Sequence, residues 1–264
     1  MVTLQVVGGG RMGSALVGGL LVAGRDAATL AVAEIDPDRQ EQVRRSWPAL
    51  QVVSAPVAAE GTLLAVKPTA AEAACRAVAA AGTRRLLSVV AGVTLRSLQS
   101  WVGSEVAVVR AMPNTPALVG AGVSAIAGGE LAGAADLAWA EELLRAVGEV
   151  VRVPEPSLDA VTGLSGSGPA YVFLLAEALV EAGVLAGLPR DVSRTLALHT
   201  IAGSGRLLLE SGSEPEALRA QVTSPGGTTA AGLRVLEQRA VRAAVLDAVT
   251  AAAERSRQLG DPEI

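Results

Sequence analysis

The chain is short of cysteine and of aromatic side chains. Cys75 is the only cysteine, which excludes a disulfide framework and a thiolate-rich metal site and is typical of a protein from a reducing compartment. Aromatic residues make up 2% of the 264 residues and the net charge is −4, so bases find few stacking platforms and phosphate backbones no basic field. We therefore expect neither a metal ion nor a nucleic acid as a partner.

Long uninterrupted apolar runs are also missing. The first ten residues, MVTLQVVGGG, lack a charged leader followed by an apolar stretch, so we expect no secretion signal. The longest uncharged stretch, residues 111–129, is broken by prolines, an asparagine and glycines, and we do not expect it to cross a bilayer. These features predict a cytoplasmic protein without a membrane partner.

Side chains that commonly act as bases are scarce as well. Lys67 is the only lysine and His199 the only histidine. A mechanism that needs a lysine or histidine base must therefore use one of these two residues. His199 lies in the middle of a helical pattern, LALHT, and we expect it to be packed or to lie in an interface.

What the first part of the chain does contain is an alternation of strand-like and helix-like segments. The strand-like runs are rich in valine, leucine and alanine and occupy residues 3–7, 29–33, 62–66, 85–90, 105–111, 122–127 and 149–153. Strands that alternate with helices are typical of βαβ units, and continuous apolar runs indicate parallel strands buried on both faces. The pattern predicts an α/β, Rossmann-type doubly wound and mainly parallel sheet.

The pattern changes at the segment VPEPS, where two prolines end the last predicted strand. From there on all periodic segments have helical spacing. We predict a dinucleotide-binding domain over residues 1–154 and an all-helical domain over residues 155–264. Segments such as YVFLLAEALVEAGVLAGL are apolar on more than one face, which favours a homo-oligomer whose helices pack between subunits.

A glycine-rich turn follows the first predicted strand. The residues Gly8, Gly9, Gly10, Arg11, Met12 and Gly13 satisfy the pattern G-x-G-x-x-G and open a helix. In this context the glycines permit a tight turn, close approach of backbone to a pyrophosphate, and close packing of helix on strand. We therefore predict that a dinucleotide binds here.

Other residues follow later strands at the same predicted edge of the sheet. Glu34 is the candidate to bind the adenosine ribose, with Asp36 second, and a carboxylate there favours NAD(H). Arg39 lies close by, and the sequence leaves NADH and NADPH both open. Further candidates to contact the cofactor are Ala65, Val66, Lys67, Pro68, Ala91 and Asn114.

A second glycine-rich loop, TSPGGTT, leads into a late helix. Its backbone N–H groups and hydroxyls predict a receptacle for a small carboxylate with a neighbouring heteroatom. The alternative, an elaborate N-cap, accounts for one hydroxyl and not for the whole set. The segment SGSGPAY at residues 165–171 opens an earlier helix in the same manner.

Taken together, GGGRMG, AVKP, AMPNTP, LSGSGPAY and VTSPGGTTAAGLRVLE resemble the pyrroline-5-carboxylate reductases, in the family's order and over nearly the whole chain. The resemblance implies hydride transfer from NADPH or NADH to pyrroline-5-carboxylate, giving L-proline. It also implies a homodimer through the helical domain, assembled further into a ring in some members. The implied substrate contacts are Ser224, Gly226, Gly227, Thr228 and Thr229, with the Thr229 hydroxyl near the imine nitrogen as the catalytic candidate.

Two other functions stay open at this point. A 3-hydroxyacid dehydrogenase of the same architecture needs a lysine or a similar base on the helical domain, which here has no lysine. A non-catalytic nucleotide-sensing protein would keep the fold for binding alone, and TSPGGTT would then have no explanation.

Overall fold

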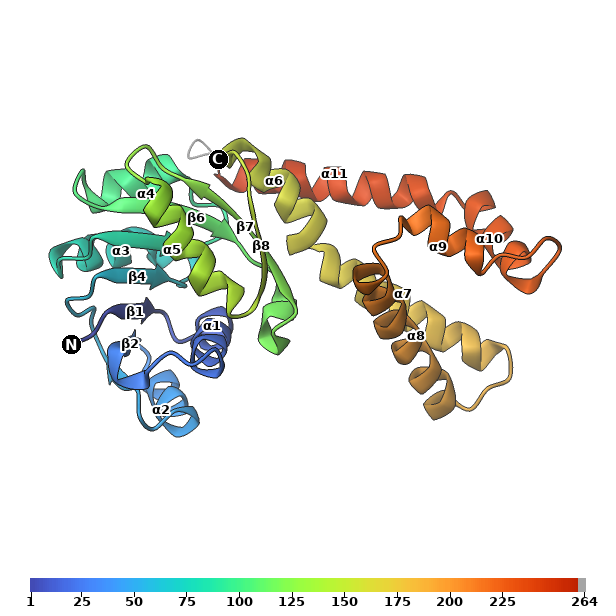
Figure 1. Cartoon of the computed structure of the whole chain (residues 1–264), viewed down its shortest axis with the longest axis horizontal. Helices are drawn as coiled ribbons and strands as arrows, with labels where there is room; N and C mark the ends of the chain where they lie inside the picture. Colours follow the sequence, from blue (N-terminus) through green and yellow to red (C-terminus); the bar gives the residue numbers. More distant parts are fainter. Residues whose placement is uncertain (261–264) are drawn as a thin grey trace. The chain divides into compact units, whose positions relative to one another are not determined.

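The computed structural model describes residues 1–260 and divides into two compact units (Figure 1). The sheet unit comprises residues 1–167 together with the described residues from Ala251 to Gly260, and the helical unit comprises residues 168–250. The predicted boundary near residue 154 concerns functional domains, and it stays a prediction.

The sheet unit contains eight strands in the order β3-β2-β1-β4-β5-β6-β7-β8. Every pair of neighbouring strands among β1 to β6 is parallel. Strand β7 is antiparallel to β6, and β8 is parallel to β7. The mainly parallel, doubly wound sheet predicted from the sequence is thus confirmed. The strands are β1 Leu4–Val7, β2 Leu30–Ala33, β3 Gln51–Val53, β4 Gly61–Leu64, β5 Arg85–Ser88, β6 Ala107–Met112, β7 Gly122–Gly128 and β8 Gly148–Arg152.

Two features of the sheet differ from a simple reading of the sequence. The edge strand β3 was not predicted, because its three residues are too few to show a pattern. The reversal at β7 follows from a short connection: β6 ends at Met112 and β7 begins at Gly122, whereas a parallel partner needs a crossover of about a dozen residues or more.

Helices cover both faces of this sheet and bury two separate cores. One core packs α1 (Arg11–Val22), α2 (Pro37–Ser46) and α5 (Ala134–Arg145) against one face, and the other packs α3 (Ala71–Ala80), α4 (Leu95–Val102) and α6 (Leu158–Val161) against the opposite face. Neighbouring strand residues alternate between the cores, so Leu63 faces the first and Leu64 the second. The single cysteine, Cys75, is a buried member of the second core, as predicted.

An ion pair fastens the segment after β8 to the sheet. The Arg110 guanidinium in β6 donates to Glu155 Oε1 at 2.9 Å, and the same oxygen accepts the Leu95 backbone N–H at 2.6 Å. Arg110 is buried, so Glu155 supplies the charge and the acceptor that its guanidinium needs. The first turn after the predicted domain boundary is therefore held by β6 and α4.

The helical unit contains helices and connecting turns only, as predicted for the described part of the chain after residue 158. Its helices α7 and α8 pack side by side as a hairpin. The elements are α7 Gly168–Leu185, α8 Arg190–Glu210, α9 Pro215–Gln221, α10 Thr228–Gln238 and α11 Val241–Gly260, the last of which continues into the residues assigned to the sheet unit.

One helical stretch of the described chain, Glu155–Leu185, is long and apolar enough to cross a membrane, by length and composition alone. Only 6% of the apolar 18-residue segment within this stretch is buried by the rest of the chain. A helix whose apolar side packs against another subunit passes the same test. The expected absence of a membrane partner stays a prediction.

Candidate active site

The candidate cofactor residues gather at one edge of the sheet. Because β1, β2, β4 and β5 are parallel, their carboxyl ends lie together: Val7 pairs with Ala33 on one side and with Leu64 on the other, and Leu64 pairs with Ser88. The strand order reverses between β1 and β4. In doubly wound folds ligands bind outside the carboxyl ends of strands at such a reversal.

The turn after β1 has a geometry that requires glycine at two positions. Gly8 has a φ of +104°, and a Cβ placed on it would lie 2.5 Å from the Ala65 carbonyl oxygen. A Cβ on Gly13 would lie 2.0 Å from the Gly8 carbonyl oxygen. These two positions therefore exclude any side chain, because backbone atoms of the residue after β4 and of the turn itself fill the space.

Gly10 differs from Gly8 and Gly13, because the space beside it is not filled by backbone atoms. It is the N-cap of α1, and among the described residues no side chain caps this helix and no acidic residue lies in its first turn. A Cβ on Gly10 would meet only the Arg39 Nη1 atom, at 3.1 Å. The first-turn N–H groups are thus left for an anion that approaches the backbone, and they fit the pyrophosphate of a dinucleotide.

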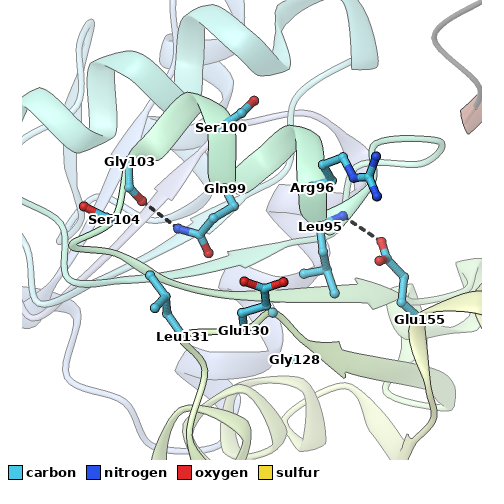
Figure 2. Close-up of a pocket in the computed structure, with 11 residues that line it drawn as sticks. Leu95, Arg96, Gln99, Ser100, Gly103, Ser104, Gly128, Glu130, Leu131 and Glu155 are labelled. Atoms are coloured by element: carbon cyan, nitrogen blue, oxygen red, sulfur yellow. Dashed lines mark hydrogen bonds between the residues drawn. The ribbon is translucent and has the colours of Figure 1, made fainter.

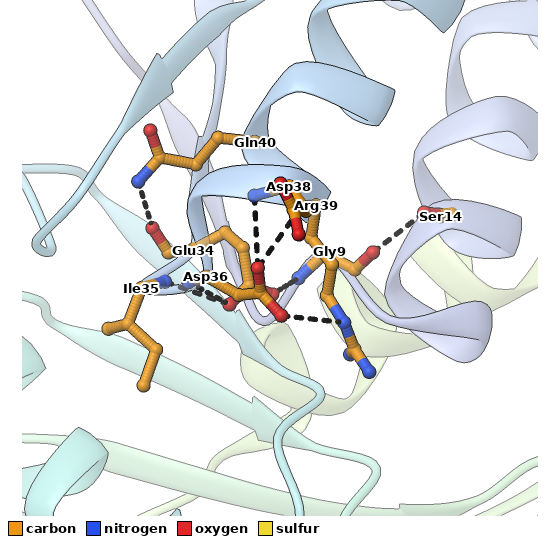
Figure 3. Close-up of polar contacts among 8 residues, drawn as sticks. All are labelled: Gly9, Ser14, Glu34, Ile35, Asp36, Asp38, Arg39 and Gln40. Atoms are coloured by element: carbon orange, nitrogen blue, oxygen red, sulfur yellow. Dashed lines mark hydrogen bonds and ion pairs between the residues drawn. The ribbon is translucent and has the colours of Figure 1, made fainter.

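Glu34 is held by backbone donors at the same edge. It is buried, its Oε2 accepts the Gly9 N–H at 2.7 Å, and its Oε1 accepts the N–H groups of Ile35 at 2.8 Å and Asp36 at 3.0 Å (Figure 3). The structure thus brings the predicted ribose-binding carboxylate directly to the glycine turn.

The remaining cofactor candidates follow β4, β5 and β6. Lys67 is exposed and precedes a short 3₁₀ turn, η2 (Pro68–Ala70), and Ala91 is exposed in the loop after β5. Asn114 is buried, and its Oδ1 accepts the Val123 N–H at 2.9 Å, which fixes the loop after β6 to the start of β7. Asn114 therefore has a structural role, and its side-chain nitrogen, Nδ2, is the part left for a ligand.

The TSPGGTT loop in the helical unit resembles the turn after β1, because it also leads into a helix through a glycine. Gly227 is the N-cap of α10, and again no described side chain caps the helix and no acidic residue lies in its first turn. Gly226 has a φ of +72°, and a Cβ on Gly227 would lie 2.5 Å from Ser224 Oγ. The hydroxyls of this loop do not serve as an N-cap, so the elaborate N-cap alternative does not explain them.

One hydroxyl of the loop has another task. Thr223 Oγ1 donates to the Arg219 carbonyl at 2.5 Å, so this hydroxyl ties the loop to α9. The α10 helix is fastened at its other end, where Arg242 Nε donates to Glu237 Oε1 at 2.7 Å; this hydrogen bond raises the pKa of the Arg242 guanidinium. Loop and helix are therefore anchored while the N–H groups at Thr228 and Thr229 stay available.

Two open pockets of the sheet unit lie away from these residues. One, of about 710 Å³, runs along α4 and the end of β7 and is lined by Gln99, Glu130 and Glu155 among others (Figure 2). The other, of about 700 Å³, is an apolar pocket beside α1. None of the predicted cofactor residues lines either pocket, so the glycine geometry and the uncapped helix ends locate the candidate site, and pocket volume does not.

One contact at the cofactor edge was missed in the sequence. The end of α11 lies against the loop after β5: a Cβ on Gly92 would be 3.4 Å from the Leu259 carbonyl oxygen. Ser256 Oγ donates to Asp159 Oδ1 at 2.7 Å and fixes the same turns of α11. The partners are far apart in the chain, and no local pattern could have paired them.

Two protein families match different parts of the chain. The family described as pyrroline-5-carboxylate reductase dimerisation matches residues 155–259, which include the long apolar stretch that ends at Leu185. The family described as NADP oxidoreductase coenzyme F420-dependent matches residues 3–92, which include the glycine turn and Glu34.

Known proteins match along the whole chain. Pyrroline-5-carboxylate reductase of Synechocystis is 42% identical over 98% of both chains. The structure of a pyrroline-5-carboxylate reductase from Coxiella burnetii superposes with a TM-score of 0.93 at 33% identity and covers 98% of this chain and 99% of its own. That of Plasmodium falciparum, solved with NADP bound, has a TM-score of 0.85 at 31% identity and covers 98% of both chains. The chain therefore belongs to the pyrroline-5-carboxylate reductase family.

Proposed function

We propose that this protein reduces the C=N bond of L-1-pyrroline-5-carboxylate to L-proline by hydride transfer from NAD(P)H, the last step of proline biosynthesis. The observation that carries the proposal is the pair of glycine-capped helix ends, at Gly10 and Gly227, which no described side chain caps. One suits a pyrophosphate and the other a small carboxylate. Family membership supports this pairing of ligands.

The residues of the sheet unit would bind the cofactor. The backbone from Gly8 to Gly13 would receive the pyrophosphate at the start of α1, and Glu34 the adenosine ribose. The loops after β4, β5 and β6, at Ala65–Pro68, Ala91 and Asn114, would border the nicotinamide half. When bound, the reduced nicotinamide supplies the hydride.

The residues at the start of α10 would bind the substrate. The N–H groups of Thr228 and Thr229 would hold the carboxylate. Gly227, whose own N–H donates to the Ser224 carbonyl at 3.0 Å, would shape the loop around the ring together with Ser224 and Gly226. The Thr229 hydroxyl would orient the imine nitrogen. Reduction of a C=N bond does not require an enzymic base to remove a proton from carbon or oxygen, so a site of backbone donors and hydroxyls is sufficient for positioning.

We further propose that residues 1–154 act as the dinucleotide-binding domain and residues 155–264 as the substrate-binding and dimerisation domain. The protein would form a homodimer through the helical domain, and dimers would assemble into a larger ring. It would act in the cytoplasm, without nucleic acid or membrane partners, in keeping with its acidic net charge and single buried cysteine.

The experiment that tests the function follows the absorbance of the reduced cofactor with purified protein. We expect oxidation of the cofactor with pyrroline-5-carboxylate and none with 3-oxoacids. Turnover of 3-oxoacids alone would favour the hydroxyacid dehydrogenase. Cofactor binding without turnover of either substrate would favour a nucleotide-sensing protein.

The role of Thr229 is tested by Thr229→Ala. The loss of a hydrogen bond to the substrate should lower kcat/KM for the imine by about 10- to 100-fold and leave the Kd of the cofactor unchanged. Thr223→Ala is the matched control, since this hydroxyl is already bonded to α9, and it should change kcat/KM less than about twofold. Equal kcat/KM values for Thr229→Ala and the unmodified protein would remove Thr229 from the mechanism.

A further inference from the structure

The Glu34 carboxylate fills an anion site made by the protein's own backbone. The exposed fraction of Glu34 is 7%, and among the described residues its carboxylate accepts from three backbone N–H donors, those of Gly9, Ile35 and Asp36. Figure 3 shows these donors converging on it from the glycine turn and from the segment after β2. Gln40 Nε2 also donates to the Glu34 carbonyl at 2.6 Å, so the backbone at this position is fixed as well.

Successive backbone N–H groups that point to one place form a concavity that binds anions. At the end of the second strand of a dinucleotide-binding fold, this place adjoins the 2′ position of the adenosine ribose. Here the N–H groups of Ile35 and Asp36 are already bonded to a carboxylate that is covalently part of the chain. A 2′-phosphate would have to displace that carboxylate or approach it without these donors.

The charges near Glu34 also disfavour binding of a 2′-phosphate. The segment from Glu34 to Gln40, EIDPDRQ, carries three carboxylates and a single cation, Arg39. Arg39 Nε lies 3.6 Å from Asp36 Oδ2, so its charge is already partly balanced. The dianionic 2′-phosphate would therefore meet a net negative segment, whereas a ribose hydroxyl can donate to a carboxylate without that repulsion.

The Arg39 guanidinium also lies close to the start of α1. Its Nη1 atom is 3.1 Å from the position of a Cβ on Gly10, at the uncapped start of α1. This is where the pyrophosphate is expected, and the pyrophosphate is the same in NADH and NADPH. Arg39 is thus placed to strengthen binding of both cofactors.

On the basis of the proposed function, we propose that Glu34 is the residue that makes this protein selective for NADH over NADPH, and that Arg39 serves the pyrophosphate that the two cofactors share. The selectivity arises because a built-in carboxylate occupies the donors that a 2′-phosphate would use.

The first test needs no variant and no turnover. Isothermal titration of the unmodified protein with ADP-ribose and with its 2′-phosphate should give a Kd at least about tenfold lower for ADP-ribose, which corresponds to about 1.4 kcal/mol. The ratio of kcat/KM for NADH to that for NADPH should show the same preference. Equal or tighter binding of the 2′-phosphate would overturn the proposal.

Variants separate the two charges. Glu34→Gln should shift the ratio of the two Kd values toward the 2′-phosphate by about tenfold or more, because it removes the charge and one of the acceptors. Asp38→Asn, which removes a charge from the same segment without touching these donors, is the matched control and should change the ratio less than about threefold. Arg39→Gln should weaken binding of ADP-ribose and of its 2′-phosphate by similar factors.

Two outcomes of these variants would contradict the proposal. One is a Glu34→Gln protein that keeps the Kd for ADP-ribose and also an unchanged ratio. The other is an Arg39→Gln protein that loses affinity for the 2′-phosphate alone, which would make Arg39 a 2′-phosphate ligand. If the imine is not reduced while the binding ratios hold, the proposed function fails and the role of Glu34 stands.

Discussion

The sheet unit and the helical unit handle their apolar side chains in opposite ways. In the sheet unit the large aliphatic residues of β1, β4 and β5 are almost entirely inaccessible to solvent. Among the described residues of the helical unit, the buried apolar side chains are Val180 and Ala197, while many leucines of α7 and α8 are exposed in the single chain.

This difference indicates how each unit becomes stable. The sheet unit covers both faces of its sheet with its own helices and needs no other chain for its cores. Large exposed apolar surfaces mark interaction sites, and the match to a dimerisation family over residues 155–259 supplies the partner, a second copy of this chain. One unit is closed by its own chain, and the other is completed by assembly.

The largest effect expected from this comparison concerns Cys75 in the closed unit. Burial raises the pKa of the Cys75 thiol to about 12. At pH 8 only about one thiol in 10⁴ would then be ionised, against about a quarter for a free cysteine. Alkylation by iodoacetamide should therefore be at least about 1,000-fold slower in the folded protein than in urea, as followed by mass spectrometry. Labelling at equal rates in both states would mean that this core opens freely.

A truncation in the sheet core should have the next largest effect. Leu87 in β5 is completely buried, so Leu87→Ala should lower the free energy of unfolding by about 2–5 kcal/mol. Denaturant melts monitored by circular dichroism measure this loss. Because the contact lies within one chain, the loss should be the same at low and high protein concentration, and a loss confined to dilute protein would contradict a self-contained core.

A charge on the helical unit should act mainly on assembly. Leu174 in α7 is 66% exposed in the single chain, so Leu174→Asp should leave the chain folded and raise the Kd of the dimer by about 100-fold or more. Analytical ultracentrifugation across a range of concentrations checks this. Val22→Asp on α1, where the side chain is 90% exposed in the sheet unit, is the control and should leave the dimer intact. A dimer that tolerates Leu174→Asp must bury another face of the helical unit.

Much of the fold could be predicted because its signals are local. The runs TLQVV, TLAVA and TLLAV are mostly apolar on both faces, and this pattern already implies strands covered on both faces. Edge strand β3 and the reversed direction of β7 could not be predicted in the same way. The first is too short to show a period, and the second depends on the length of a connection.

The candidate site, like the fold, could be predicted only in part from the sequence. The glycine positions were predictable, since the need for glycine at Gly8 and Gly13 comes from backbone atoms in a turn that the motif itself describes. The state of Glu34 was not, because its donors come from two segments, at Gly9 and after β2, that only folding brings together. The placement of Leu259 beside Gly92 had no signal in the sequence at all.

By itself, the sequence determined the class of the fold, the glycine turn, the hydroxyl-rich loop and the family, because each depends on residues close together in the chain. Only the tertiary structure decided that Glu34 occupies a backbone anion site, that Arg39 lies against Gly10, and that no described side chain caps the start of α10. Hydrogen bonds and close contacts between distant segments are set by three-dimensional packing, which a one-dimensional pattern does not encode.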